Sequence, residues 1–253
     1  MMNIFSDIYS VFWLDLRNMQ RHWKATIATS LVLPLLYLVA FGYGLGRGID
    51  VDGFSYLAFV IPGIVALTAF STSFNGASSK LQVDKMFYKS FDELLMSPVS
   101  SYAIIIGKAL IGVVRGGISA IAIYLAGLAL APTLLVNTQV TLLFLLLMLL
   151  SCFVFALFGV MVALLISSHH GMSNFSTLVI LPMTFLCGTF FSLNQLPSIA
   201  KVVLYFLPLT HSANLLRSTM LCLPFPWLSF AGLLIFGAIF FAGCLFALKK
   251  SSV

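Results

Sequence analysis

The sequence predicts an all-α integral membrane protein with six transmembrane helices. Hydrophobic residues make up 61% of the 253 residues, charged residues make up 8%, and the mean hydropathy is +1.10. Soluble domains are typically about 45–50% apolar and about 25% charged, so this composition excludes a soluble domain. Several apolar runs reach the ~20 residues that a helix needs to cross a bilayer. No long stretch alternates apolar and polar residues with a period of two, as the strands of a membrane barrel would.

The first segment, residues 3–24, predicts an amphipathic helix that lies along the membrane surface. Apolar residues recur there every three or four positions, and the polar residues fall on the other side of the helix. Those polar residues are Asp7, Ser10, Arg17, Arg21 and Lys24. A helix docked on a soluble domain is the alternative, but the sequence contains no such domain.

Six apolar runs follow, and each is expected to span the membrane. They are residues 25–46, 54–79, 102–131, 138–167, 173–191 and 227–248. Between the last two spans, residues 192–226 hold four prolines, and their apolar stretches are too short to cross. The whole chain, 1–253, is therefore expected to form one transmembrane domain.

An even number of spans places both termini, Met1 and Val253, on the same side of the membrane. Ten lysine and arginine residues fall on that side, against three on the other: Arg47, Lys201 and Arg217. Because positive residues concentrate in cytoplasmic loops, both termini and the charged segment 80–101 are expected in the cytoplasm.

The segment 80–101 contains the adjacent carboxylates Asp92 and Glu93, and Glu93 is the only glutamate in the chain. A short amphipathic helix is expected here, ended by Ser97 and Pro98. Its apolar face is formed by Phe87, Phe91, Leu94 and Leu95. Two interpretations remain open: a handle on which a partner acts, or a simple interfacial turn.

Several sequence blocks, taken in order, resemble the membrane subunits of type-2 ABC exporters. The blocks are "AFGYGLG" (40–46), "GFSYLAFVIPGI" (53–64), "FDELLMSPVS" (91–100), "VVRGG" (113–117) and "LPLTHSANLLRSTML" (207–221). The family includes bacterial permeases for nodulation factors, polysaccharide O-antigen and some drugs, and the last block looks most like the nodulation-factor exporters. The resemblance covers almost the whole chain.

The resemblance implies a type-2 ABC exporter fold in the bacterial cytoplasmic (inner) membrane. Residues 87–99 would be the coupling helix, 3–24 the interface helix, and 192–226 the re-entrant helices at the outer mouth. The implied partners are a second copy of the chain, two ABC ATP-binding subunits and membrane lipid, with no nucleic acid; a periplasmic partner is left open. The implied ATPase-coupling residues are Phe87, Phe91, Asp92, Glu93, Leu94, Leu95 and Pro98.

No catalytic residue, cofactor or metal site is expected in this chain. A phosphate-binding loop needs GxxxxGK[ST], and Gly107-Lys108 is followed by Ala109 within an apolar helix. ATP and Mg²⁺ would therefore bind the partner ATPase. The expected cargo, exported from the cytoplasm or the inner leaflet, is a lipid-linked saccharide, glycolipid, lipid or hydrophobic drug.

Two other function classes are weighed against a permease. A secondary transporter would favour acidic residues inside its spans, whereas every Asp and Glu here is expected in a loop or a surface helix. A membrane-embedded acyltransferase would need a pair such as His-Asp at the membrane edge, and the sequence offers none. The adjacent His169 and His170 are expected to cap a span, and the four cysteines are expected to be small packing residues.

Six residues are candidates for the translocation path or its gate: Arg115, Phe190, Phe191, Tyr205, His211 and Arg217. Lys108 is expected to extend to the headgroups. Arg115 either contacts an anionic or sugar-bearing substrate in a cavity or has a structural role in the dimer or gate. The aromatic residues either contact cargo or form an interfacial belt, and His211 is expected to satisfy backbone groups near Pro208.

Overall fold

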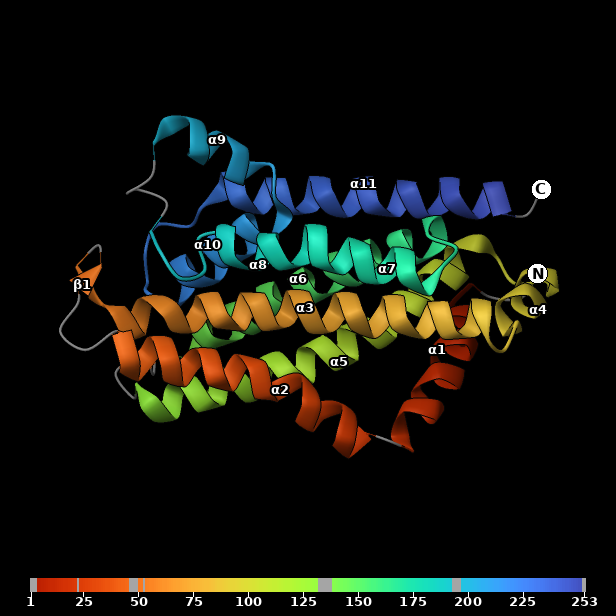
Figure 1. Ribbon diagram of the computed structural model, residues 1–253, viewed down its shortest axis with the longest axis horizontal. Helices are drawn as coiled ribbons and strands as arrows, with labels where there is room; N and C mark the ends of the chain where they lie inside the picture. The colour runs from red at the N-terminus through yellow and green to blue at the C-terminus, as the bar shows by residue number, and fades with distance from the viewer. Residues whose placement is uncertain are drawn as a thin grey trace.

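A computed structural model describes residues 4–21, 23–45, 50–51, 53–131, 138–192 and 197–251. These residues form a bundle of long helices with shorter helices at its two ends (Figure 1). The positions of Met1, Arg47 and Val253, which entered the predicted topology, lie outside the described residues.

Five of the described helices are long and apolar enough to cross a membrane. The long elements are α2 (Trp23–Val39) with the π-helical turn η1 (Ala40–Leu45), α3 (Tyr56–Met86), α5 (Ser101–Leu130), α6 (Thr138–Leu165) and α11 (Trp227–Ser251). The predicted span 173–191 falls on three consecutive segments, α7 (His169–Phe175), η3 (Ser176–Ile180) and α8 (Leu181–Leu186), which run beside α3 (Figure 1). This segment is not one of the five, so the count of six spans stays a prediction.

The helix α3 lies at the centre of the bundle and packs against α2, α5, α6 and α10. It begins where the hydroxyl of Ser55 accepts a hydrogen bond from the Ala58 backbone N–H, as N-cap residues do. A Cβ added to Gly159 of α6 would lie 2.5 Å from the backbone oxygen of Phe74. Glycine therefore lets the backbones of α3 and α6 approach closely, as small residues do between membrane helices.

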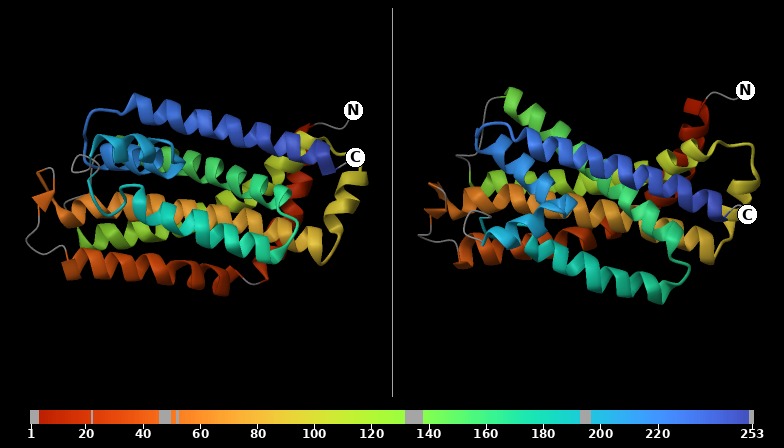
Figure 2. Two further views of the ribbon diagram at one scale, coloured as in Figure 1. Left: turned by 45° about the horizontal axis from the view of Figure 1, so that its top comes forward. Right: turned by 90° about the horizontal axis from the view of Figure 1, so that it is seen from above.

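The helix α1 (Ile4–Gln20) runs across the long axis of the bundle (Figure 2). Its exposed face is apolar and includes Phe5, Tyr9, Trp13 and Leu14, as expected for a helix on a membrane surface. Its opposite face packs on α5, and the acidic residues Asp7 and Asp15 of that face are buried. The expectation that Asp7 faces water is therefore wrong.

One end of the bundle carries α1, α4 (Ser90–Met96) and the last turn of α11 (Figure 1). The other end carries α9 (Ser198–Tyr205), α10 (Pro208–Met220) and a two-stranded antiparallel ribbon of β1 (Asp50–Val51) and β2 (Phe54–Ser55). In the predicted re-entrant segment 192–226, α10 is largely buried and packs on α3, α6 and α11. Below, the first end is called the α4 end and the second the α9 end.

We expect Gly159→Ala to lower the stability of the protein, because the new methyl group would meet the Phe74 carbonyl on α3. Overpacking of this kind costs about 1–3 kcal/mol, which should lower the melting temperature in detergent by several degrees. Gly44→Ala is the matched control, because a Cβ there has no heavy atom within 4 Å. Equal melting temperatures for the two variants would contradict the close α3–α6 contact.

Candidate functional site

Four oppositely charged side chains meet inside the bundle near the α4 end. The Nζ of Lys108 on α5 lies 2.6 Å from a carboxylate oxygen of Asp84 on α3 and 2.9 Å from one of Asp15 on α1. The Nζ of Lys80 on α3 lies 2.6 Å from the other oxygen of Asp84 and 3.6 Å from Asp15. Two ammonium groups therefore balance two carboxylates, and this charge cluster joins α1, α3 and α5.

The charge cluster corrects two sequence predictions. Lys108 is only 4% exposed and does not extend to the headgroups. Asp84 is also buried and lies in the long helix α3, although every carboxylate was expected in a loop or a surface helix; Asp15 lies in α1, as expected, but is buried. Asp84 was misplaced because α3 continues to Met86, through residues that the sequence analysis assigned to a charged loop. Burying a charge costs several kcal/mol, which the close opposite charges offset.

The short helix α4 connects α3 to α5 at this end. It begins after Lys89, whose φ of 53° turns the chain, and ends at Ser97, which is extended as residues before proline prefer. Asp92 and Glu93 lie in its first turn, and both are exposed. Pro98 is also exposed. The acidic pair is therefore free to contact a partner.

The predicted apolar face of α4 is split between the protein core and the surface. Phe91 is 2% exposed and packs beside Leu81 and Ile105, within the core of this chain. Leu94 and Leu95 are partly buried against the same core. The exposed apolar side chains in α4 and in the three residues before it are Phe87, Tyr88 and Met96. The expectation that Phe91 faces outward with Phe87 is therefore wrong, because the helix turns Phe91 inward.

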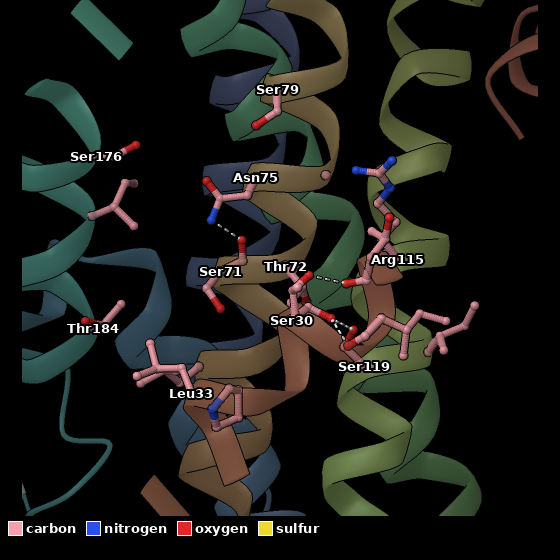
Figure 3. Close-up of a pocket in the computed structure, with 18 of the residues that line it drawn as sticks. Ser30, Leu33, Ser71, Thr72, Asn75, Ser79, Arg115, Ser119, Ser176 and Thr184 are labelled. Atoms are coloured by element: carbon pink, nitrogen blue, oxygen red, sulfur yellow. Dashed lines mark hydrogen bonds between the residues drawn. The ribbon is translucent and has the colours of Figure 1, made fainter. Parts of the chain in front are cut away.

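A cavity of about 500 Å³ opens between α2, α3, α5 and the η3–α8 segment (Figure 3). A stripe of small polar residues on α3 forms one wall: Ser71, Thr72, Asn75, Gly76 and Ser79. Their spacing of three and four residues places them on one side of the helix. The other walls add Ser30 of α2, Ser119 of α5, and Ser176 and Thr184 across the cavity.

Arg115 is the one charged side chain among the described residues that line this cavity. Figure 3 shows its guanidinium at the level of Asn75, beside α3, while the Asn75 side chain points to the other side of that helix. A Cβ added to Gly76 would lie 2.9 Å from Cδ of Arg115, so the absence of a side chain at Gly76 makes room for the arginine. Of the two interpretations of Arg115 left open by the sequence, this placement favours a residue that faces a cavity.

The predicted path residues near the α9 end separate into two groups. Phe190 packs in an aromatic cluster with Tyr37, Phe41 and Phe185, with its ring centroid 4.3 Å from that of Phe41. Tyr37 and Phe185 also line the cavity. Phe190 therefore packs behind two side chains of the cavity wall and does not line the cavity itself. Phe191 is partly buried.

The second group makes contacts with the backbone. The guanidinium of Arg217 donates hydrogen bonds to the carbonyls of Phe59 and Gly188, at 3.2 and 2.8 Å, and ties α10 to α3. The Nε2 of His211 lies 2.9 Å from the backbone oxygen of Tyr205, close to Pro208 as expected. The structure therefore brings Arg115 to the cavity, but it does not bring Tyr205, His211 or Arg217 there.

The histidine pair and the cysteines lie outside the charge cluster and the cavity. His169 and His170 are exposed at the start of α7, which Ser168 caps. No group of three or more possible metal ligands occurs among the described residues. Cys152, Cys187 and Cys244 are buried, whereas Cys222 is exposed.

Two features of the site were missed by the sequence analysis. The stripe on α3 has a sequence signal, because Ser71, Asn75 and Ser79 recur every four residues within an apolar span. The charge cluster has only a weak signal, the Lys80–Asp84 pair at a spacing of four. Its other two members are distant in the sequence, and only the packing of three helices brings them together.

The sequence pattern of the family described as "ABC-2 type transporter" matches residues 6–221, most of the chain. The chain belongs to this family. Among the ABC-2 relatives, Inner membrane transport permease YadH of Escherichia coli (strain K12) is 28% identical over 206 residues, which are 80% of this chain and 78% of YadH. Nodulation protein J of Rhizobium meliloti (strain 1021) is 32% identical over 208 residues, again 80% of this chain and 78% of the relative. The protein is thus a membrane protein of the ABC-2 transporter type.

We expect Lys108→Met to destabilise this ABC-2 protein strongly, because it leaves two buried carboxylates with one ammonium group. Removing one partner of a buried ion pair costs about 3–5 kcal/mol. The measurement is the fraction of protein that stays monodisperse after heating in detergent.

The control is Lys250→Met, which removes an exposed lysine at the same end of the bundle. Adding Asp84→Asn to Lys108→Met should recover part of the stability, because one lysine then faces one carboxylate. If Lys108→Met is as stable as Lys250→Met, the charge cluster does not hold the helices together.

Proposed function

We propose that this chain is the membrane-spanning permease subunit of an ATP-driven ABC exporter. Its cargo is a lipid-linked saccharide, glycolipid, lipid or hydrophobic drug, moved out of the cytoplasm or the inner leaflet. The observation that carries the proposal is the cavity between α2, α3, α5 and η3–α8, with its polar stripe inside an apolar bundle. Membership of the ABC-2 family supports the same conclusion.

The working unit is a homodimer with two ABC ATP-binding subunits, and these bind ATP and Mg²⁺. The cavity is lined on one side by α2, which is the least buried of the five candidate spans. Leu33 of α2 lines the cavity, while Leu36 and Val39 of the same helix are exposed. A second copy packed against this helix would close the cavity, so that each chain supplies half of the path.

The contact with the ATP-binding subunit is made through α4. Exposed Phe87, Tyr88 and Met96 supply apolar contact, while Asp92 and Glu93 meet basic residues and set the register. Both helices that α4 connects, α3 and α5, border the cavity. Movement of α4 on ATP binding therefore shifts two walls of the cavity together.

The topology that fits this role has six crossings in a bacterial inner membrane, with α7–η3–α8 as the fifth and the α4 end in the cytoplasm. Lys249 and Lys250 in the last turn of α11 lie at this end, in agreement with the excess of positive residues in cytoplasmic segments. The helices α9 and α10 then form the re-entrant outer mouth, with Arg217 and His211 as its structural contacts.

A secondary transporter would need a buried carboxylate that can exchange a proton or an ion. Asp15 and Asp84 are buried, but each lies within 3 Å of a lysine ammonium group. Both carboxylates are therefore engaged in ion pairs within the chain. The charge cluster therefore favours a structural role, and the permease remains the better account.

We expect Tyr88→Ala combined with Met96→Ala to weaken binding of the ATP-binding subunit at least roughly 30-fold, since anchors of this size are worth about 2 kcal/mol or more. Glu93→Lys should have a smaller effect that grows with falling salt concentration, because it reverses a rim charge. The measurement is co-purification of the ATP-binding subunit with each variant, together with ATPase activity.

The matched control is Ile239→Ala combined with Phe246→Ala, which removes two exposed apolar side chains from α11. Phe91→Ala should instead lower the stability of the chain itself, because Phe91 belongs to the core. Wild-type assembly and coupling in both the Tyr88/Met96 and Glu93 variants would show that α4 is not the docking element.

A further inference from the structure

The cavity changes character along its length. Toward the α4 end its walls carry Arg115, Asn75 and Ser79 together with the apolar Trp23, and toward the α9 end they carry Thr184, Leu33 and other apolar side chains (Figure 3). Those others are Pro34, Tyr37, Leu67, Leu181 and Phe185. The α3 part of the wall, from Ser79 to Leu67, is about 18 Å long at 1.5 Å per residue. The one charged group of the described lining therefore lies toward the α4 end, and most of the apolar lining lies toward the α9 end. The end that carries Arg115 is called the polar end below.

Arg115 brings a net positive charge to the polar end. The carboxylate that attracts the Arg115 guanidinium is that of Asp15. This carboxylate is already paired with Lys108 and Lys80 in the charge cluster. Because that cluster contains equal numbers of ammonium and carboxylate groups, Arg115 is the excess cation. Its Nε is buried and has no hydrogen-bond partner among the described residues. A buried donor without a partner is costly, and an anionic ligand would satisfy it.

The polar groups beside Arg115 differ in their capacity to bind a ligand. Ser30 and Ser119 are hydrogen-bonded to each other at 2.9 Å, and Thr72 bonds to its own helix. The hydroxyls of Ser79 and Ser176 have no partner within the described part of the chain. The amide nitrogen of Asn75 donates to the Ser71 carbonyl, which leaves its oxygen for a ligand. These groups face the cavity from α3 and from η3, whereas Arg115 enters it from α5 (Figure 3).

We infer that this cavity binds an amphiphile with an anionic headgroup, such as a phosphate ester on an alkyl chain. The anion pairs with Arg115, and the chain lies along Leu33 and Phe185. The inference rests on the proposed function for its direction, because the α4 end is there assigned to the cytoplasm. A lipid of the inner leaflet has this orientation, with its headgroup toward the cytoplasm and its chain toward the bilayer centre.

The test uses the fluorescence of Trp23, which lines the cavity. The chain has three tryptophans, so Trp13→Phe and Trp227→Phe leave Trp23 as the only one. The full chain in neutral detergent is titrated with a hexadecyl phosphate that carries bromine near the headgroup, and in parallel with the matching brominated hexadecyl maltoside. Bromine quenches tryptophan on contact, so saturable quenching reports binding at the cavity.

We expect half-saturation at a roughly tenfold lower concentration for the phosphate than for the maltoside. A charge-assisted hydrogen bond to Arg115 would increase the affinity by about this factor. Arg115→Gln should remove this difference, whereas Arg115→Lys should retain most of it. Lys250→Gln, which removes an exposed charge outside the cavity, should leave it unchanged.

If the two probes reach half-saturation at equal concentrations in the protein that retains Arg115, the inference is overturned, regardless of the results for the Arg115 variants. Retention of the preference in Arg115→Gln would overturn it as well. The titration contains no ATP-binding subunit and no nucleotide. Failure of the anionic preference therefore leaves the permease role intact, and failure of the complex to assemble or to transport leaves the binding result intact.

Discussion

Buried Asp15, Asp84 and Lys108, joined by the partly buried Lys80, fix the geometry of this protein at the α4 end, where three helices cross. Lys108 reaches Asp15 of the surface helix α1 and Asp84 of the central helix α3, so α1, α3 and α5 meet at one point. Each of these charges would be too costly to bury alone, and only the complete set is compensated. The position of α1 against the bundle and the relative positions of α3 and α5 therefore depend on one another.

Because of this constraint, α4 and the cavity are both attached to the same pair of helices, α3 and α5. The helix α4 joins the ends of α3 and α5, and the cavity lies further along the same two helices. A force applied to α4 cannot separate α3 from α5 without breaking buried ion pairs. We therefore propose that the α4 end moves as a unit together with α1.

Much of the fold was predictable because lipid allows few solutions to a sequence this apolar. The long runs that became α3, α5, α6 and α11 were found, and the amphipathic α1 was recognised from its periodicity. The wrong predictions concerned residues whose burial depends on tertiary packing. Phe91 and Lys108 have no local feature that shows whether they face a partner, the headgroups or the core. The partners that bury them, such as Ile105 for Phe91 and Asp15 for Lys108, are distant in the sequence or lie on another helix.

The central claim is that movement of α4 reaches the cavity. The most direct test is the distance between spin labels at Ser90 on α4 and Thr184 on the cavity wall, in the complex with its ATP-binding subunit and with the exposed Cys222 changed to serine. The account predicts that a non-hydrolysable ATP analogue shifts this distance, and that the shift disappears when Lys108→Met breaks the charge cluster in a complex that still assembles. An unchanged distance while the analogue is bound would contradict it.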